Sequence, residues 1–119
     1  MVLSKSSEFD SEKKRFSELT KALSHPARLA ILEILADRKE CMCGHISEKL
    51  PLAQSTVSQH LKALKETGLI KGTISGASIC YDVNPEVLRE CCELFDRFCE
   101  KMMSKDKVQI GEVSKDCKS

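Results

Sequence analysis

The stretch "LPLAQSTVSQHLKALKETGLIKG", residues 50–72, carries the pattern that decides how this chain folds. Val57, Leu61 and Leu64 are spaced four and three residues apart, which places them on one face of an α-helix. We therefore predict a helix over residues 55–67 whose apolar side packs on a core.

The ends of this helix are marked by residues with known positional preferences. Pro51 stops the segment before the helix, because proline cannot continue a helix or a central strand. Ser55 or Gln54 is the expected cap, and Gly68 is the residue type that commonly ends a helix. A short segment or helix over residues 41–50, a tight turn and this helix form a predicted helix-turn-helix.

The opposite face of the helix is small, polar and neutral to basic, so it can enter a major groove of DNA. Glutamine pairs with base edges, and serine and threonine reach bases or phosphates. A solvated surface face is the alternative, whereas His60, on the flank of the apolar stripe, is expected to be packed and hydrogen-bonded. The candidate DNA-contacting residues, with two from the segment that follows, are Gln54, Ser55, Thr56, Ser58, Gln59, Lys62, Lys71 and Ser75.

Apolar periodicity in the rest of the chain predicts three further helices and two strands. Helices are predicted over residues 11–23, 24–36 (capped by Ser24) and 85–103, and strands over 70–74 and 79–83 joined by the turn "SGAS". The predicted fold class is mainly α (α+β), a winged helix-turn-helix with a two-stranded β wing. One domain spans residues 11–103, between a disordered tail over 1–10 and a flexible tail over 104–119.

Length and composition narrow the class of protein further. A chain of 119 residues with a net charge of +1 suits one domain. We recognise no signal peptide and no apolar run of about 18 residues, so we expect a cytoplasmic protein that does not interact with a membrane. An enzyme is not expected, because no acid–base group is paired with a nucleophile and no CxxC redox pattern is present.

The chain is rich in cysteine for its size. An odd number without an export signal indicates thiols rather than a disulfide framework, which leaves core filling, metal binding or redox sensing. The seven are Cys41, Cys43, Cys80, Cys91, Cys92, Cys99 and Cys117. Cys117 lies in a polar tail and is taken as incidental.

Cys41 and Cys43 form the first candidate site. In an extended segment, residues two apart point the same way with Cα atoms about 6.5–7 Å apart, so two thiolates can close on one ion. Such soft ligands select thiophilic ions: trivalent arsenic or antimony, cadmium, lead, Cu(I) or zinc. His45 lies on the same side, and Cys80 on the second strand is a further candidate ligand. The alternative is that these cysteines fill apolar positions.

Cys91, Cys92 and Cys99 on the last helix form a rival site. Cys92 and Cys99 are separated by about 10.5 Å along the axis, so they cannot share one ion within a single helix. Cys91 and Cys92 can chelate or can join a site across a dimer. Small apolar groups in a dimer interface are the alternative reading.

Three segments, "ALSHPARLAILEILA", "LPLAQSTVSQHLKALKETGLIKG" and "GASICYDV", resemble in order and spacing the ArsR/SmtB family of metal-responsive bacterial repressors. The resemblance covers roughly residues 16–100. It implies a homodimer with an α-helical interface built from the first and last helices. It also implies repression through an inverted repeat of operator DNA, read by residues 54–64, and release when an inducer binds.

Arsenic-sensing members of that family carry a "CxC" just ahead of the helix-turn-helix, where this chain has Cys41-Met42-Cys43. The pair here is displaced by one residue, and Ile46 and Ser47 occupy the region of a third cysteine. The resemblance thus implies a repressor released by As(III)/Sb(III) or another thiophilic ion, with no organic cofactor. A cadmium-, lead- or zinc-responsive repressor is one alternative. A redox- or persulfide-responsive repressor, acting through a pair such as Cys91/Cys92 or Cys43/Cys80, is the other.

Overall fold

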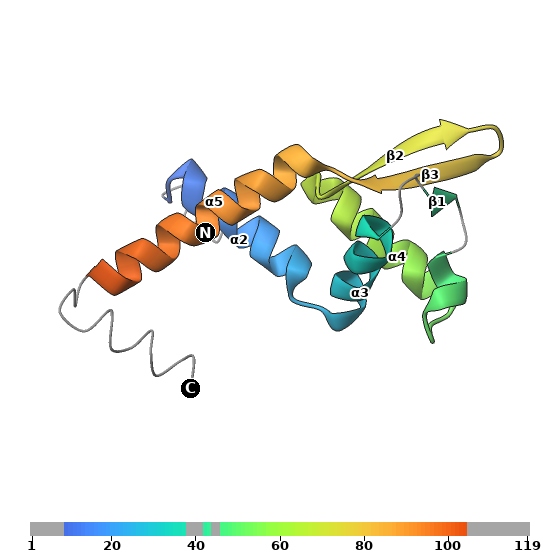
Figure 1. Ribbon diagram of the computed structural model, residues 1–119, viewed down its shortest axis with the longest axis horizontal. Coiled ribbons are helices and arrows are strands. Elements are labelled where there is room, and N and C mark those ends of the chain that lie inside the picture. The colour runs from blue at the N-terminus through green and yellow to red at the C-terminus, as the bar shows by residue number, and fades with distance from the viewer. Residues whose placement is uncertain (1–8, 38–41, 44–45, 105–119) are drawn as a thin grey trace, which may run out of the picture.

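The computed structural model describes residues 9–37, 42–43 (by their backbone) and 46–104. The tails predicted as disordered or flexible lie almost wholly outside these residues. The elements, in chain order, are α2 (Ser11–Leu23), α3 (Pro26–Ala36), β1 (Met42–Cys43), the 3₁₀ helix η1 (Ile46–Lys49), α4 (Gln54–Thr67), β2 (Ile70–Ser75), β3 (Ser78–Val83) and α5 (Pro85–Ser104). The predicted winged helix-turn-helix is confirmed, and Figure 1 shows its wing reaching away from the helices.

The core forms where all the helices and the base of the wing meet. α4 contributes the predicted stripe of Val57, Leu61 and Leu64, and the wing contributes Leu69 and Ile70 at its base. The other buried apolar residues come from α2, α3, η1 and α5; they are Leu19, Ala22, Ile31, Leu35, Ile46, Cys91 and Leu94. α4 is therefore held on its apolar side by α2, α3, η1 and the base of the wing.

Two predicted helix caps differ from the structure. α3 is capped by His25 rather than Ser24, because the His25 Nδ1 accepts a hydrogen bond from the Ala27 N–H at 3.1 Å. α4 begins at Gln54 after Ala53, which offers no side-chain cap. Its first-turn N–H groups therefore have no side-chain acceptor at the cap position.

The segment between α3 and α4 was predicted as a short segment or helix. Its described part is instead a two-residue strand, β1, followed by the 3₁₀ helix. β1 adds to the predicted wing, so the described sheet has the antiparallel order β1-β3-β2. In this register Cys43 stands opposite Cys80, and Cys80 stands opposite Thr73 on β2.

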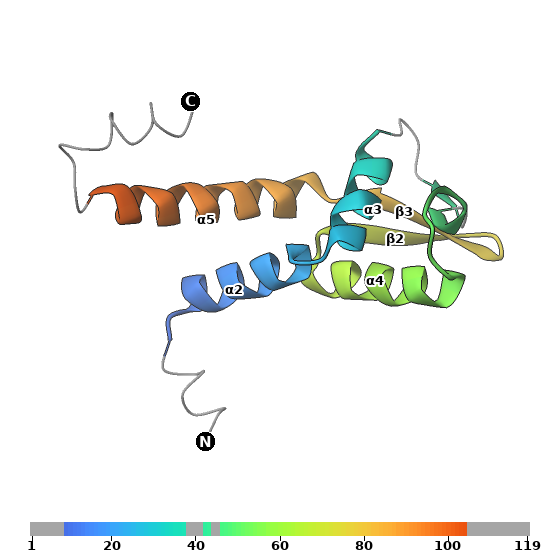
Figure 2. The same cartoon turned by 90° about the horizontal axis from the view of Figure 1, so that it is seen from below.

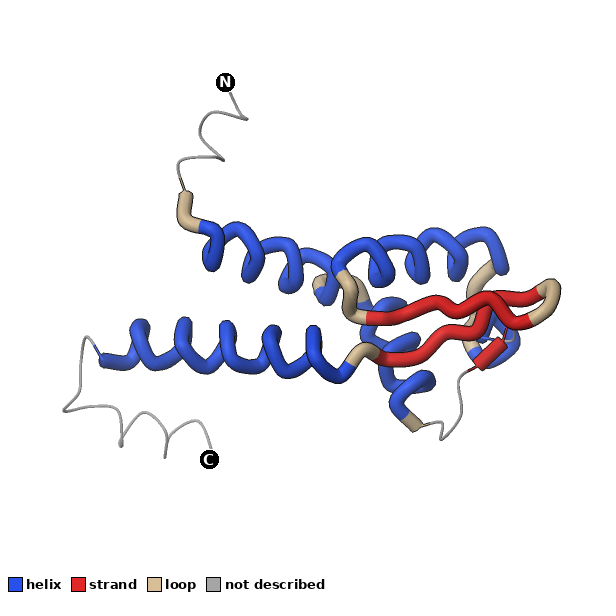
Figure 3. The backbone as a smooth tube through the Cα atoms, turned by 90° about the horizontal axis from the view of Figure 1, so that it is seen from above, coloured by secondary structure: helices blue, strands red, loops and turns tan. Residues whose placement is uncertain are grey.

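α2 and α5 lie side by side, away from the wing (Figures 1 and 3). The Phe16 ring packs edge-on against Phe95, with ring centroids 5.1 Å apart. The Arg15 guanidinium donates two hydrogen bonds of 3.1 Å to the Glu90 carboxylate. None of the helices in the described part of the chain is both long and apolar enough to cross a membrane.

Candidate functional site

The outer face of α4 is built as the sequence predicts. Val57, Leu61 and Leu64 turn into the core, which forces the polar residues between them outward. The candidate DNA-contacting residues on this helix are exposed, except the half-buried Thr56. Lys71 and Ser75 are exposed on β2. The fold thus presents a polar helix face together with a polar edge of the wing.

A groove separates this face from the wing. Gln54 and Ser58 of α4 line it on one side, and Ser78 and Ile79 of β3 line it on the other. Figure 2 shows α4 running beneath the hairpin, with its N-terminal end at the same end of the molecule as the hairpin turn. The N-terminal end of α4 and the tip of the wing therefore lie next to each other on the surface of the protein.

The position of α4 depends on a cluster of polar side chains at the α3–α4 junction. His60 is buried, with 8% of its surface exposed. Its Nδ1 accepts a hydrogen bond from the Arg28 Nε–H at 3.2 Å, and the rings of His60 and His25 lie 4.4 Å apart. The Arg28 Nη1 also donates to the Ala22 carbonyl at 3.4 Å. The prediction that His60 is a packed, hydrogen-bonded residue is confirmed.

The same cluster disfavours a charged imidazole. Burial lowers the pKa of His60, and the nearby His25 and Arg28 charges add to this effect. Because Nδ1 accepts from Arg28, the proton of the neutral ring resides on Nε2. Protonation of His60 Nδ1 would set its N–H against the Arg28 Nε–H, so this hydrogen bond forms only with the neutral ring.

The first candidate cysteine site is brought together only in part within the described residues. Cys41, His45 and the side chain of Cys43 lie outside them, whereas the backbone of Cys43 pairs with that of Cys80. Directly opposed residues of an antiparallel pair have Cβ atoms about 4.5–5.5 Å apart. That spacing is close to the separation that sulfur–sulfur or sulfur–ion bonding requires.

Cys80 is part of a disulfide bond in this structure. The expectation of thiols throughout the chain is therefore wrong for Cys80. Three cysteines of α5, Cys91, Cys92 and Cys99, are free. The proximity of β1 to the wing, which the sequence pattern did not reveal, is what turns Cys43 and Cys80 into neighbours.

The rival cysteines on α5 lie in unlike environments. Cys91 is buried in the core, and this burial raises the pKa of its thiol, with a further contribution from Cys92 and Glu90. Cys92 and Cys99 are exposed. Within the described residues, no three His, Cys, Asp or Glu side chains gather closely enough to hold a metal ion.

These features define a class: a winged helix-turn-helix regulator of transcription that binds DNA and is not an enzyme. A family model described as "Bacterial regulatory protein, arsR family" matches residues 25–71. A helix-turn-helix transcriptional regulator of Methanocaldococcus jannaschii is 36% identical over 81 residues, covering 67% of this chain and 90% of the relative. The arsenical resistance operon repressor of Staphylococcus xylosus is 35% identical over 75 residues, covering 63% and 71% respectively. The chain belongs to the ArsR family.

A solved structure agrees with this placement. The homodimeric winged helix-turn-helix domain of Mb0332 from Mycobacterium bovis superposes with a TM-score of 0.57 at 26% identity. The superposition covers 73% of this chain and 81% of that one.

The His60 environment predicts a pH dependence of stability. A lowered native pKa means that the unfolded chain binds the proton first as pH falls below the ordinary histidine value of 6.5. The free energy of unfolding should therefore be highest above this pH and should decrease as pH falls from there to the native pKa. Urea unfolding of the wild type and of His60→Gln between pH 7.5 and 5 measures the difference.

His60→Gln should show a weaker loss of stability over that pH range, because it removes the proton uptake at this site. Lys62→Gln provides a matched control, since Lys62 is an exposed residue of the same helix. Equal slopes for the wild type and His60→Gln would mean that His60 is not the group responsible.

Proposed function

We propose that this protein is a transcriptional repressor that binds an inverted repeat of operator DNA as a homodimer. It releases the DNA when a thiophilic ion such as As(III) or Sb(III) binds to Cys43 and Cys80, with Cys41 as a third ligand. One observation carries this proposal: the register pairs Cys43 of β1 with Cys80 of the wing. The name of the S. xylosus relative, an arsenical resistance operon repressor, supports the choice of ion.

The chemistry follows from the donor set. Thiolates are soft ligands, so they favour arsenic, antimony, cadmium, lead or zinc over hard cations. Binding requires deprotonated, reduced sulfur, so Cys80 must first leave its disulfide. Cadmium, lead and zinc remain rival inducers of the same site.

The site is placed to act on DNA binding because of what it connects. β1 precedes η1 and α4 in the chain, and Cys80 belongs to the wing. A bond between β1 and β3 therefore fixes the wing relative to the segment that leads into the reading helix. Ion binding and operator binding then favour different arrangements, with a reciprocal coupling of about 1–3 kcal/mol.

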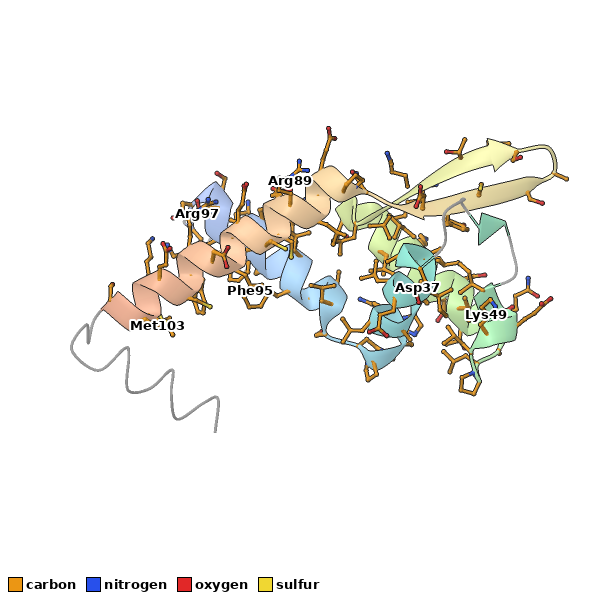
Figure 4. All side chains as sticks on the ribbon, viewed as in Figure 1. Asp37, Lys49, Arg89, Phe95, Arg97 and Met103 are labelled. Carbon is orange, nitrogen blue, oxygen red and sulfur yellow. The ribbon has the colours of Figure 1, made fainter. Side chains whose placement is uncertain are left out.

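A homodimer would place two reading helices in successive major grooves, about 34 Å apart. α5 leaves large apolar side chains exposed, and Figure 4 marks Phe95 and Met103 among them. The others on this helix are Phe98 and Met102. A second copy covering this face agrees with the homodimeric state of the M. bovis domain.

The ion proposal predicts the behaviour of cysteine variants. Reduced wild-type protein should leave its operator as arsenite is added, whereas Cys43→Ser and Cys80→Ser should stay bound at the same concentration. Fluorescence anisotropy of a labelled duplex measures release. The double variant Cys92→Ser/Cys99→Ser is the matched control, since these exposed thiols lie outside the proposed site.

Release of Cys43→Ser and Cys80→Ser at the wild-type arsenite concentration would contradict the assigned ligands. Loss of response in Cys92→Ser/Cys99→Ser would instead favour the rival site on α5. Repeating the titration with Cd(II), Pb(II) and Zn(II) identifies the preferred ion.

The disulfide at Cys80 favours a second candidate function, a repressor that responds to sulfur oxidation. Cys43, opposite it in the register, is the proposed partner. In this reaction two protein thiols and a persulfide RSSH yield the protein disulfide, a thiol RSH and hydrogen sulfide. The protein loses two electrons to the persulfide, and the new sulfur–sulfur bond ties β1 to the wing.

The oxidation candidate predicts a defined product. A persulfide donor added to reduced protein should produce a Cys43–Cys80 cross-link, detected by mass spectrometry of peptides digested without reductant. Operator affinity should change at the same donor concentration, and a reductant should reverse both effects. A cross-link confined to other cysteines, or a cross-link that leaves affinity unchanged, would argue against this candidate.

The homodimer predicts the effect of charge on the exposed face of α5. Met102→Lys/Met103→Lys should sediment as a monomer, because the apolar surface that a second copy covers would carry charge. Its operator affinity should fall by about tenfold or more, because a single reading helix makes half of the contacts. Glu100→Lys, also an exposed position on α5, is the control and should remain dimeric. A dimeric double variant would contradict this interface.

A further inference from the structure

The tip of the wing exposes two apolar side chains. Ile74 is 80% exposed and Ile79 is 41% exposed. They are cross-strand partners on β2 and β3, so they form one pair on one face of the hairpin. Exposed isoleucine is unfavourable in water, which makes this pair the feature of the wing that most needs explaining.

The pair continues the buried face of the hairpin beyond the core. Ile70 and Val83 are register partners at the base of the wing, where Ile70 is buried and Val83 packs against the core. Strand alternation puts Ile74 on the same face as Ile70, four residues and roughly 14 Å further along the strand. The core-facing side of the wing thus stays apolar to its end, although the core stops below it.

Charge is absent from this part of the sequence. Between Lys71 and Asp82 the chain reads "GTISGASICY", with no acidic residue, lysine or arginine. The tip therefore neither attracts nor repels phosphate strongly. Contact between this part of the wing and DNA therefore does not rest on ion pairing.

The turn holds the pair in a fixed orientation. Ser75 pairs with Ser78, which leaves a two-residue loop of Gly76 and Ala77. Gly76 has a φ of 63°, and Ala77 has a negative φ, as in the tight turns that match the twist of a hairpin. A Cβ added at Gly76 would meet nothing within 4 Å, so the turn projects into open space.

The pair borders the surface that reads DNA. Ile79 and Ser78 line the same groove as Gln54 and Ser58 of α4. The hairpin turn and the N-terminal end of α4 lie at the same end of the molecule in Figures 2 and 3. A duplex with its major groove on α4 would therefore present its backbone and neighbouring minor groove to the wing tip.

We propose that Ile74, supported by Ile79, is an apolar wedge that enters the minor groove and selects deformable base steps. Isoleucine is among the side chains that insert between base steps in this groove. Pyrimidine–purine steps such as TA and CA open most readily, so the wedge would give specificity without hydrogen bonds to bases. This proposal rests on the proposed DNA binding and adds a second source of specificity to it.

The size of the patch favours DNA over a protein partner. A stable protein interface buries about 800 Å² on each partner, far more than two isoleucine side chains supply. A minor-groove wedge needs only one or two side chains. The uncharged flanks fit insertion, because the wedge can approach the groove without an acidic residue nearby.

The test uses a duplex that wild-type protein selects from a random pool, with 2-aminopurine placed at the step facing the wing. Ile74→Ala should bind this duplex about tenfold more weakly, the size expected from losing most of the burial of one isoleucine. Wild type should raise the 2-aminopurine fluorescence by unstacking the step, and Ile74→Ala should not. Thr73→Ala, on the opposite face of the same strand, is the matched control and should behave as wild type.

A charged variant separates the wedge from simple attraction to phosphate. Ile74→Lys should steepen the dependence of affinity on salt by about 0.9 for each phosphate it contacts, yet lose the preference for TA over AA at the probed step. Ile74→Ala should leave the salt dependence unchanged. These different signatures follow because the wild-type contact is apolar.

Two results would overturn the wedge, and only the second would also overturn the proposed function. Ile74→Ala with wild-type affinity, step preference and fluorescence would exclude a wedge while leaving operator binding intact. Pool selection that yields no preferred duplex for wild type would remove the proposed function and the wedge together. Because Ile74 is exposed, circular dichroism should show Ile74→Ala folded as wild type.

Discussion

The burial of one side of α4 is the constraint on which the rest of the structure depends. Val57, Leu61 and Leu64 anchor the helix to a core supplied by every other layer, and His60 fixes its flank through Arg28. Because that side is buried, helix geometry turns the polar side of α4 toward solvent. The outward polar face of α4 is therefore a consequence of core packing.

The spacing of these apolar residues is also why the fold could be predicted from the sequence. The periodic spacing of apolar residues, together with helix-ending residues such as glycine and proline, defines each long helix. The predicted ranges of α2, α4 and α5 therefore agree closely with the structure. The cap of α3 could not be predicted, because His25 serves through a ring nitrogen that ordinary cap preferences do not favour. The strand β1 could not be predicted, because a strand of two residues is too short to show an alternating pattern.

The candidate site, like the fold, could be predicted only where local sequence patterns determine it. Exposed residues of α4 could be assigned from helical geometry alone, since a helix face is a local property. Residue type alone offered Cys43 and Cys80 as one of two candidate pairs, but the register that sets them opposite each other depends on contact between segments far apart in the sequence. Naming Cys80 as a further ligand was possible from residue type, but its position relative to β1 came only from the sheet. Cys80 and the wing tip therefore belong to one hairpin, at different distances from its turn.

The shortness of β1 limits how much of the scaffold the proposed sulfur site would involve. Its attachment to the sheet consists of two register positions, and a single cysteine on each strand is enough to create the pairing. An ancestral wing would need only two point substitutions to acquire the chemistry, with no change to its core. Under the proposed function, the sulfur site is thereby separable from the scaffold, because none of the buried core residues that the structure describes belongs to it.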